Sequence, residues 1–502
     1  MTAAPPYDLL GDVLSRWEPV IGLETHVELG TASKMFCGCD TTFGAKPNTQ
    51  TCPVCLGLPG ALPVVNAEAV RATVAIGLAL HCDIAPWSRF ARKNYFYPDM
   101  PKDFQISQYD EPLCTDGYLD VPDPVSGESV RVGIERVHME EDTGKSLHVG
   151  GATGRIHGAD HSLLDYNRAG IPLVEIVTRP DIRSPEVARA YVTELRDLLR
   201  ALGVSDVRME QGSLRCDVNT SLRPVGLGES ANFGTRTETK NVNSLRSVER
   251  AVRAEIVRQA PLLEAGERIR QETRHWHEND GVTSPGRSKE EATDYRYFPE
   301  PDLVPLALDG AYVDEVRGGL AETPAERRAR LVGLHGWTEL EVRQLAAAGV
   351  LDLAEETIAA GAPAGEVKAV WMNDVAAVAR ERGVEIADLG VGPDDVADVI
   401  ALRAAGTISA RGAREVVAGL AAGEGTPAEI VAARGLQLLG DTGELDRLVA
   451  AAIEAQPAAA DKVRDGRTAA VGALIGAVMK ASGGNVDAAA VKDKLLAALT
   501  GP

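Results

Sequence analysis

The sequence has few aromatic residues, few cysteines and no long apolar run. Only 4% of its 502 residues are Phe, Trp or Tyr. No apolar stretch approaches the roughly 20 residues that a membrane-spanning helix needs. The first ten residues contain neither the basic nor the apolar region of a signal peptide. We therefore expect a cytoplasmic protein that does not enter a membrane.

Positive charge is also scarce. Lys and Arg number 52 against 73 Asp and Glu, which gives a formal net charge of -21. This balance argues against a broad basic surface that coats nucleic acid, although it leaves room for a local basic patch. The seven cysteines are an odd number and favour metal binding or free thiols over a disulfide framework. The length exceeds one ordinary core and indicates several domains.

Three adjacent carboxylates follow a strand pattern. Apolar and charged residues alternate over residues 130–137 and lead into His138, Glu140, Glu141 and Asp142. Because side chains alternate along a strand, Glu141 takes the opposite face from His138 and Glu140. Such close carboxylates repel unless a cation, hydrogen bonds or water relieves them, and Mg²⁺ is held by one or two carboxylates with waters and substrate phosphates. The alternative is a solvated acidic turn at a strand end.

Two further alternating stretches, residues 20–29 and 207–218, carry polar side chains on one strand face. Their titratable side chains include Glu24, His26, Glu28, Glu210, Arg215 and Asp217. Residues 235–244 add Glu238, Lys240 and Asn241. Each stretch alone is also compatible with a half-buried strand with a polar outer side. The recurrence of acidic faces with lysine and asparagine nearby favours one shared site.

Two close pairs of cysteines lie near the N-terminus. Cys37 and Cys39 are followed, after twelve residues, by Cys52 and Cys55. This spacing matches a structural zinc site in which four thiolates bind at about 2.3 Å and leave no open coordination position. Free buried thiols and a redox pair are the alternatives.

Cations, amides and aromatic residues gather around two prolines in residues 92–108. In this loop-rich stretch Lys93 and Lys102 can hold phosphate, and an aromatic ring can stack on a base. The alternative is that the aromatic rings anchor an irregular loop on the core.

Helices are indicated in several places. Apolar positions recur with helical period over residues 66–80, and Ser184 with the following proline marks a helix start after a strand within residues 165–177. Beyond about residue 306 the chain is rich in Ala, Val, Leu and Glu, and it has no aromatic residue after Trp371. This part is therefore predicted to be all-helical. The expected domains are residues 1–306, 307–424 and 425–502.

Five motifs, in order along the chain, resemble those of the B subunit of tRNA-dependent amidotransferases. They are IGLETHVEL at 21–29, RKNYFYPD at 92–99, HMEEDTGKS at 138–146, MEQGSLRCD at 209–217 and DYRYFPEPD at 294–302. Several long motifs in register are far more specific than any one of them, and the resemblance covers essentially the whole chain.

The resemblance implies an α+β fold: a cradle domain on a largely antiparallel sheet, then a helical domain and a small helical tail similar to YqeY-type proteins. It implies a heterotrimer in which the partners are an amidase, the A subunit, and a small C subunit. Such an enzyme uses ATP and glutamine to convert Glu-tRNA(Gln) to Gln-tRNA(Gln), and often Asp-tRNA(Asn) to Asn-tRNA(Asn). The A subunit releases ammonia from glutamine. The B subunit phosphorylates the misacylated carboxylate and lets ammonia displace the phosphate.

The resemblance also carries a magnesium site to this chain. Its expected members are Glu24, His26 and Glu141, with Glu140, Glu210 and Asp217 as further candidates. The expected contacts to ATP phosphates are Lys93, Lys102, Lys240 and Asn241. The zinc site at Cys37, Cys39, Cys52 and Cys55 is argued from spacing alone.

A non-catalytic tRNA-binding scaffold, in which the acidic strands merely pack or bind a structural ion, is the alternative function.

Residues 426–502 carry eight Lys and Arg against nine Asp and Glu, so this tail is nearly neutral on an acidic chain. An RNA backbone meets least repulsion there. The resemblance also implies that the tail contacts tRNA, although an ordinary helical module with mixed charge has the same composition.

Overall fold

The computed structural model describes residues 10–150, 158–228, 233–286, 295–438, 442–483, 486 and 488–500. The chain forms two compact units, Met1–Pro324 and Ala325–Pro502. No helix among the described residues is both long and apolar enough to cross a bilayer.

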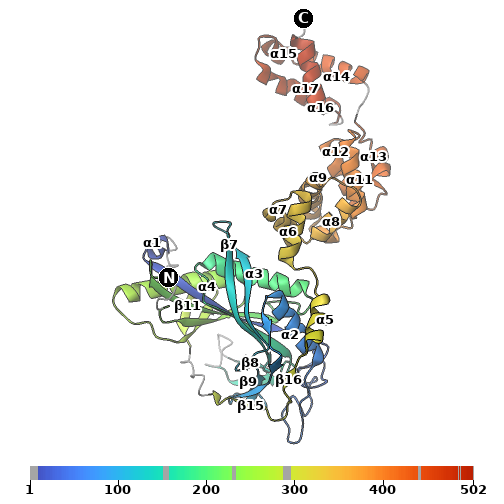
Figure 1. Ribbon diagram of the computed structural model, residues 1–502. Coiled ribbons are helices and arrows are strands. Elements are labelled where there is room, and N and C mark those ends of the chain that lie inside the picture. The colour runs from blue at the N-terminus through green and yellow to red at the C-terminus, as the bar shows by residue number, and fades with distance from the viewer. Residues whose placement is uncertain are drawn as a thin grey trace. The chain divides into compact units, whose positions relative to one another are not determined.

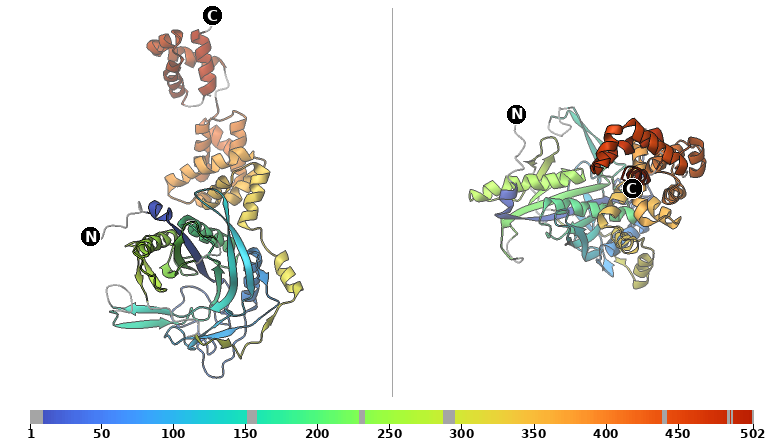
Figure 2. Two further views of the ribbon diagram at one scale, coloured as in Figure 1. Left: turned by 60° about the vertical axis from the view of Figure 1, so that its left-hand side comes forward. Right: turned by 90° about the horizontal axis from the view of Figure 1, so that it is seen from above.

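The first unit is built on one large, curved sheet (Figures 1 and 2). The strands of this unit are β1 (Trp17–Glu28), β2 (Asp83–Ile84), β3 (Trp87–Ser88), β4 (Ala91–Asn94), β5 (Phe104–Ser107), β6 (Cys114–Pro122), β7 (Ser129–Glu141), β8 (Lys145–Val149), β9 (His161–Asp165), β10 (Pro172–Thr178), β11 (Leu214–Pro224), β12 (Thr237–Val242), β13 (Thr273–His277), β14 (Val282–Pro285), β15 (Phe298–Pro299) and β16 (Leu306–Ala307).

The large sheet has twelve strands in the order β14-β13-β12-β11-β1-β10-β7-β5-β4-β15, with β6 paired to β7 and β2. Among the described strand pairs, β12 and β13 alone are parallel. Strands β8 and β9 form a separate hairpin, and β3 pairs with β16. The expected largely antiparallel sheet is confirmed.

Alternation along β1 separates a core face from a polar face. Ile21, Leu23 and Val27 are buried in the hydrophobic core, while Glu24 and His26 point to the other side. The same alternation in β7 buries Val137 and Met139 in the core. The sheet therefore presents an apolar face to the helices and a polar face on its other side.

Helices cover the core face of the sheet. They are α1 (Leu10–Leu14), α2 (Ala67–Ala79), α3 (Pro185–Ala201), α4 (Leu245–Glu264) and α5 (Gly310–Gly318). The predicted start of α3 is confirmed, because the Ser184 hydroxyl accepts a hydrogen bond from the Val187 amide and Pro185 occupies the first turn. Tyr191 and Leu195 of this helix are fully buried in the core.

One predicted strand is wrong in its first half. Residues 207–213 form turns, and β11 begins only at Leu214. Val207 and Gly212 both have positive φ, at 48° and 85°, which an extended strand does not contain. The Arg208 amide donates to the Ser213 hydroxyl at 2.8 Å and closes the turn. Alternation in the sequence did not reveal this local hydrogen bonding.

All named elements of the second unit are helices, which confirms the predicted all-helical region (Figure 1). They are α6 (Pro324–His335), α7 (Glu339–Ala347), α8 (Leu351–Ala359), α9 (Ala364–Ala369), the π-helical η3 (Val370–Val375), α10 (Ala376–Arg382), η4 (Ile386–Leu389), α11 (Pro393–Ala404), α12 (Ala410–Ala421), α13 (Pro427–Arg434), α14 (Thr442–Ala455), α15 (Pro457–Arg464), η5 (Thr468–Ala470), α16 (Val471–Ala481) and α17 (Ala488–Thr500).

The buried side chains of this unit fall into two clusters. One spans Leu331 to Leu436 and surrounds the fully buried Trp371. The other spans Leu445 to Leu499. The two domain boundaries expected from the sequence, at residues 306/307 and 424/425, stay predictions.

Candidate active site

Strand register brings polar residues from five strands onto the face opposite the core. His26 of β1 lies opposite Glu175 of β10, and Glu175 lies opposite His138 of β7. On the other side of β1, Glu24 lies opposite Asp217 of β11. Side chains directly opposite each other on one face are about 5 Å apart at Cβ. The register alone therefore assembles a continuous row of titratable groups.

A first cluster consists of His26, Glu140 and Glu175. One ligand atom from each lies within 4.8 Å of the others, and His26 Nε2 is 3.7 Å from Glu175 Oε2. Ser107 Oγ donates to Glu140 Oε1 at 2.8 Å, and Gln105 Nε2 donates to Glu140 Oε2 at 3.0 Å. These neutral donors fix the orientation of a carboxylate that is 3% exposed.

His138 lies behind this cluster and is fully buried. Its Nε2 is 3.4 Å from Glu140 and 3.3 Å from Glu175. Burial lowers the pKa of His138, but Glu175 and Glu140 outweigh it and raise that pKa to about 9. Burial likewise raises the pKa of Glu175, yet His138 and His26 hold it well below its usual value. The carboxylates are therefore ionised at neutral pH.

A second cluster consists of Glu24, Asp217 and Glu238, whose ligand atoms also lie within 4.8 Å of one another. Lys240 Nζ is 2.7 Å from Asp217 and 3.7 Å from Glu238. Asn219 Nδ2 donates to Glu24 Oε1 at 2.9 Å. Lys240 thus already offsets part of the negative charge of this cluster.

Side chains of both clusters line one cavity of about 910 Å³. Lys93 also lines it, with Nζ 5.0 Å from the Tyr295 ring centroid. Burial lowers the pKa of Lys93, but Glu140 and neighbouring tyrosines more than offset this, and the net shift is upward. The rings of Tyr109 and Tyr297 stack at 5.4 Å on the same wall. The cavity therefore combines carboxylates, ammonium groups and aromatic surface.

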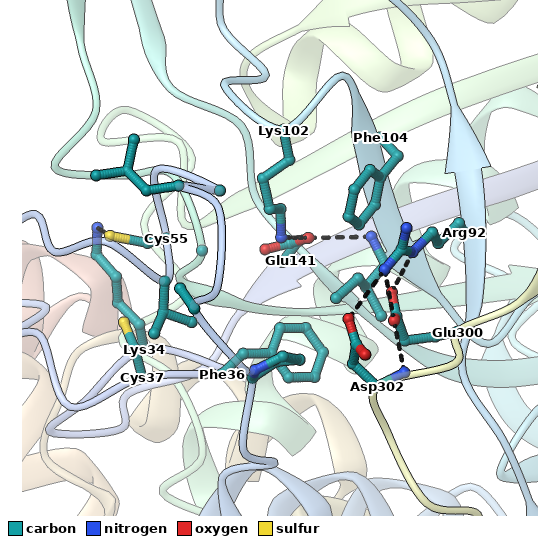
Figure 3. Close-up of a pocket in the computed structure, with 17 residues that line it drawn as sticks. Lys34, Phe36, Cys37, Cys55, Arg92, Lys102, Phe104, Glu141, Glu300 and Asp302 are labelled. Atoms are coloured by element: carbon teal, nitrogen blue, oxygen red, sulfur yellow. Dashed lines mark hydrogen bonds and ion pairs between the residues drawn. The ribbon is translucent and has the colours of Figure 1, made fainter.

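Glu141 is not brought to these clusters. It faces a separate cavity of about 230 Å³ on the core side of β7 (Figure 3). There its carboxylate pairs with Lys102 and accepts a hydrogen bond from the Ile106 amide at 3.0 Å. The structure places Glu141 where strand alternation had put it, on the opposite side from Glu140. Lys102 shares this position, away from the first two clusters.

Two other expected members also lie elsewhere. Glu210 is exposed, in the turn that precedes β11. Asn241 is exposed with a φ of 65°, and its Nδ2 is 3.3 Å from His275 Nδ1. Neither lines the large cavity. The reason is the turn at residues 207–213 in one case and the irregular backbone of β12 in the other.

Sequence reasoning did not assign Glu175 to the site, although its strand was expected. All seven residues of β10 are buried, so alternation gave no polar face to read. The available signal was a lone carboxylate in an apolar run, because a buried carboxylate requires a partner.

The four predicted cysteines come together. One Sγ atom from each of Cys37, Cys39, Cys52 and Cys55 lies within 4.8 Å of the others, and Cys52 and Cys55 Sγ are 3.9 Å apart. All seven cysteines of the chain are free thiols. The hydrogen bond from Cys37 lowers the pKa of Cys55 to about 5. The cluster is compatible with a tetrathiolate metal site.

A cavity with buried carboxylates, an imidazole and flanking lysines is suited to an enzyme that uses a divalent cation to handle phosphoryl groups. Comparison with known proteins identifies the family. Residues 19–314 match the family model described as the GatB/GatE catalytic domain, and residues 352–499 match the one described as the GatB domain. The chain belongs to the GatB/GatE family, as its motifs indicated.

Similar proteins cover the whole chain. The B subunit of the aspartyl/glutamyl-tRNA(Asn/Gln) amidotransferase of Frankia casuarinae is 67% identical over 496 residues, which are 98% of this chain and 97% of that protein. The proteins of the same name from Salinispora arenicola and Nocardioides sp. are 62% and 63% identical over 499 and 489 residues. These matches cover 99% and 97% of this chain, and 98% and 97% of the two proteins.

Proposed function

We propose that this chain is the subunit of a tRNA-dependent amidotransferase that phosphorylates a misacylated carboxylate and then amidates it. Its relatives are named as B subunits of aspartyl/glutamyl-tRNA(Asn/Gln) amidotransferases. It is accordingly an aminoacyl-tRNA amidotransferase subunit that works with partner subunits on a tRNA substrate. The partners are the amidase, or A, subunit and the small C subunit. Whether Gln-tRNA or Asn-tRNA is the product depends on the synthetases of the organism.

The chemistry follows from the weak electrophilicity of a carboxylate. The carboxylate oxygen of the esterified Glu or Asp attacks the γ-phosphorus of ATP, ADP leaves, and an acyl phosphate forms. Ammonia then attacks the acyl carbon and loses a proton, and inorganic phosphate leaves. The observation that carries the proposal is the convergence of two acidic clusters with Lys93 and Lys240 on one cavity.

The residues of the first cluster fit a hard divalent cation. Glu140 and Glu175 supply ionised oxygens, His26 supplies a ring nitrogen, and Gln105 and Ser107 hold Glu140 in place. Mg²⁺ at this position would neutralise the oxygens of the transferring phosphoryl group. In this proposal Glu140 and Glu175 take the role that the resemblance gives to Glu141. Glu24, Asp217 and Glu238 form a second candidate position for a cation.

The lysines of the cavity are the proposed contacts to ATP. Lys93 lies beside Glu140, and Lys240 pairs with Asp217. Each can exchange its carboxylate for a phosphate oxygen when nucleotide and cation enter. Phosphate would then lie between the two clusters, where the substrate carboxylate can reach it.

A structural zinc at the four cysteines is also proposed. A tetrahedral ion with Zn–S bonds of about 2.3 Å places its sulfurs about 3.8 Å apart. The 3.9 Å between Cys52 and Cys55 Sγ fits this spacing. Zinc there would hold the loop between Cys37 and Cys55 together and would leave no position for substrate.

The cytoplasmic location expected from the sequence stays a prediction.

The scaffold alternative does not explain the cavity. Glu140, Glu175 and Glu238 are each at most 9% exposed, and burial of several carboxylates side by side is costly. A scaffold would use these carboxylates only for packing or for a structural ion, and neither use requires two acidic clusters with Lys93 and Lys240 around one large cavity.

Amidation driven by ammonium chloride tests the proposal, because it bypasses glutamine hydrolysis by the amidase partner. The purified trimer should amidate labelled Glu-tRNA(Gln) with ATP and ammonium chloride. His26→Gln should reduce this rate by about 100-fold or more while glutamine hydrolysis persists. Wild-type rates in His26→Gln would move the chemistry to another site.

A further inference from the structure

Lys34 is a buried lysine beside the cysteine cluster. The residue is 1% exposed. Its Nζ lies 3.8 Å from Cys55 Sγ and donates to the carbonyl oxygen of Tyr166 at 3.1 Å. Figure 3 shows the amine of Lys34 directed at the sulfur of Cys55.

The other cations of this cavity have carboxylate partners. Lys102 pairs with Glu141, and Arg92 pairs with Glu300 at 2.6 Å and with Asp302 at 3.3 Å. No carboxylate among the described residues makes an ion pair with Lys34. A buried ammonium without an anion is costly, and the sulfur of Cys55 is the group beside Lys34 that can carry a negative charge.

A zinc ion bound by four thiolates carries two net negative charges and sits in a buried position. N–H donors around such a centre offset the negative charge on the sulfurs and orient the ligands, which stabilises the bound metal. We propose that Lys34 is the outer-sphere partner of this zinc site, donating a hydrogen bond to the Cys55 thiolate and offsetting one of the two negative charges. The proposal rests on the zinc assignment made above.

Lys34 also connects the cysteine cluster to the loop between β9 and β10. Its second hydrogen bond goes to Tyr166, which follows β9, and Gly170 of the same loop has a φ of 90°. A Cβ at Gly170 would lie 3.5 Å from both Cys55 Cβ and Lys34 Cδ, and 3.9 Å from Glu141 Oε2. Lys34 is therefore a positioning residue that holds the loop of the cysteine cluster against the loop between β9 and β10.

The test uses the purified trimer with Lys34→Met, Lys34→Gln and Lys34→Arg. Lys46→Met is the matched control, because Lys46 is exposed on the same loop. Zinc transfer to a colorimetric chelator should be about 10-fold faster or more in Lys34→Met, intermediate in Lys34→Gln, and near the wild-type rate in Lys34→Arg and Lys46→Met. In the cobalt-substituted trimer, the sulfur-to-cobalt charge-transfer bands should shift in Lys34→Met and stay unchanged in Lys46→Met.

The outcomes separate this inference from the zinc proposal. Purified wild-type trimer without zinc would overturn both. Zinc in the wild type, with Met and Gln variants that release it at the wild-type rate, would overturn the role of Lys34 alone. If Lys34→Met yields no soluble trimer, the comparison of Gln with Arg still decides: faster release in Gln than in Arg supports the hydrogen-bonding ammonium, and equal release contradicts it.

Discussion

Glu140 and Glu141 are adjacent in sequence but lie in different cavities. Glu140 joins His26 and Glu175 in the large cavity. Glu141 lies on the other face of the sheet, where it pairs with Lys102. The alternation of strand side chains is sufficient to cause this separation. A mutation at each position should therefore have a different consequence.

We predict that Glu140→Gln weakens the binding of a divalent cation and that Glu141→Gln does not. The first substitution removes a ligand charge, while the second leaves the cluster intact and deprives buried Lys102 of its partner. Manganese binding, followed by electron paramagnetic resonance, measures the difference. Affinity should fall by about 10-fold or more in Glu140→Gln. Equal losses in both variants would argue for a cation shared by the two carboxylates.

Glu28 gives the protein a pH dependence of stability. Burial raises the pKa of Glu28 to about 8, and its hydrogen bond to Asp142 acts in the same direction. The folded state therefore holds a proton that the unfolded state loses above the ordinary pKa of 4.5. Stability must fall as the pH rises from this value toward 8, by up to about 1.4 kcal/mol per pH unit.

We predict that Glu28→Gln flattens this dependence, because an amide keeps the hydrogen bond to Asp142 without ionising. Its melting temperature should exceed that of the wild type at pH 8.5 by more than at pH 6. Glu210→Gln, at an exposed position, is the control and should follow the wild type. A slope in Glu28→Gln equal to the wild-type slope would show that Glu28 is already ionised in the folded protein.

The strands and helices with clear hydrophobic periodicity were predictable from the sequence. β1, β7, α2 and α3 lie where their apolar patterns put them. The turn at residues 207–213 was missed because a side-chain hydrogen bond and two positive φ angles decide it. The strand order was beyond reach of local patterns, since the contact of His26 with Glu175 depends on pairing across about 150 residues.

The site was predictable in part for the same reason. Glu24, His26 and Asp217 could be placed on polar strand faces, and the cysteine spacing indicated their cluster. Glu175 was not assigned, because β10 is buried on both faces and shows no polar alternation. The assignment of Glu141 to the metal came from the resemblance, whereas the alternation in the sequence had placed Glu140, and not Glu141, on the same strand face as His138.

The cysteine loop is expected to depend on its metal. Purified, reduced trimer should contain about one tightly bound zinc per chain. Removal of zinc by a chelator should increase hydrogen exchange in residues 37–55 more than it slows amidation, because a closed tetrathiolate shell has no catalytic position. Metal analysis of freshly purified protein comes first, and an absence of zinc would refute the expectation.

The C-terminal helices are a candidate tRNA-binding element. The tail is nearly neutral, with eight basic and nine acidic residues in residues 426–502. Ile430 and Val431 of α13 belong to the hydrophobic cluster that contains Trp371, and the last cluster begins at Leu445. A truncation that spares the first of these clusters therefore ends after Leu438.

We predict that a chain ending at Leu438 forms the trimer and retains glutamine hydrolysis but binds tRNA more weakly. The truncation would remove phosphate contacts made by lysines and arginines such as Lys462, Arg464 and Lys480. Each lost contact should reduce the salt dependence of tRNA binding. Filter binding across a salt series measures affinity and slope together. A truncated trimer with the full-length affinity and slope would mean that the tail does not contact tRNA.

We propose that residues lining the large cavity promote transfer of the γ-phosphoryl group of ATP to the misacylated carboxylate. The most direct measurement is phosphoryl transfer from ATP labelled at the γ-phosphate, in trimer supplied with Glu-tRNA(Gln) but with no ammonia donor. We predict that labelled acyl phosphate accumulates with the wild type, and that His26→Gln and Glu140→Gln each reduce it by about 100-fold or more. Accumulation at the wild-type rate in both variants would show that phosphoryl transfer does not depend on this cavity.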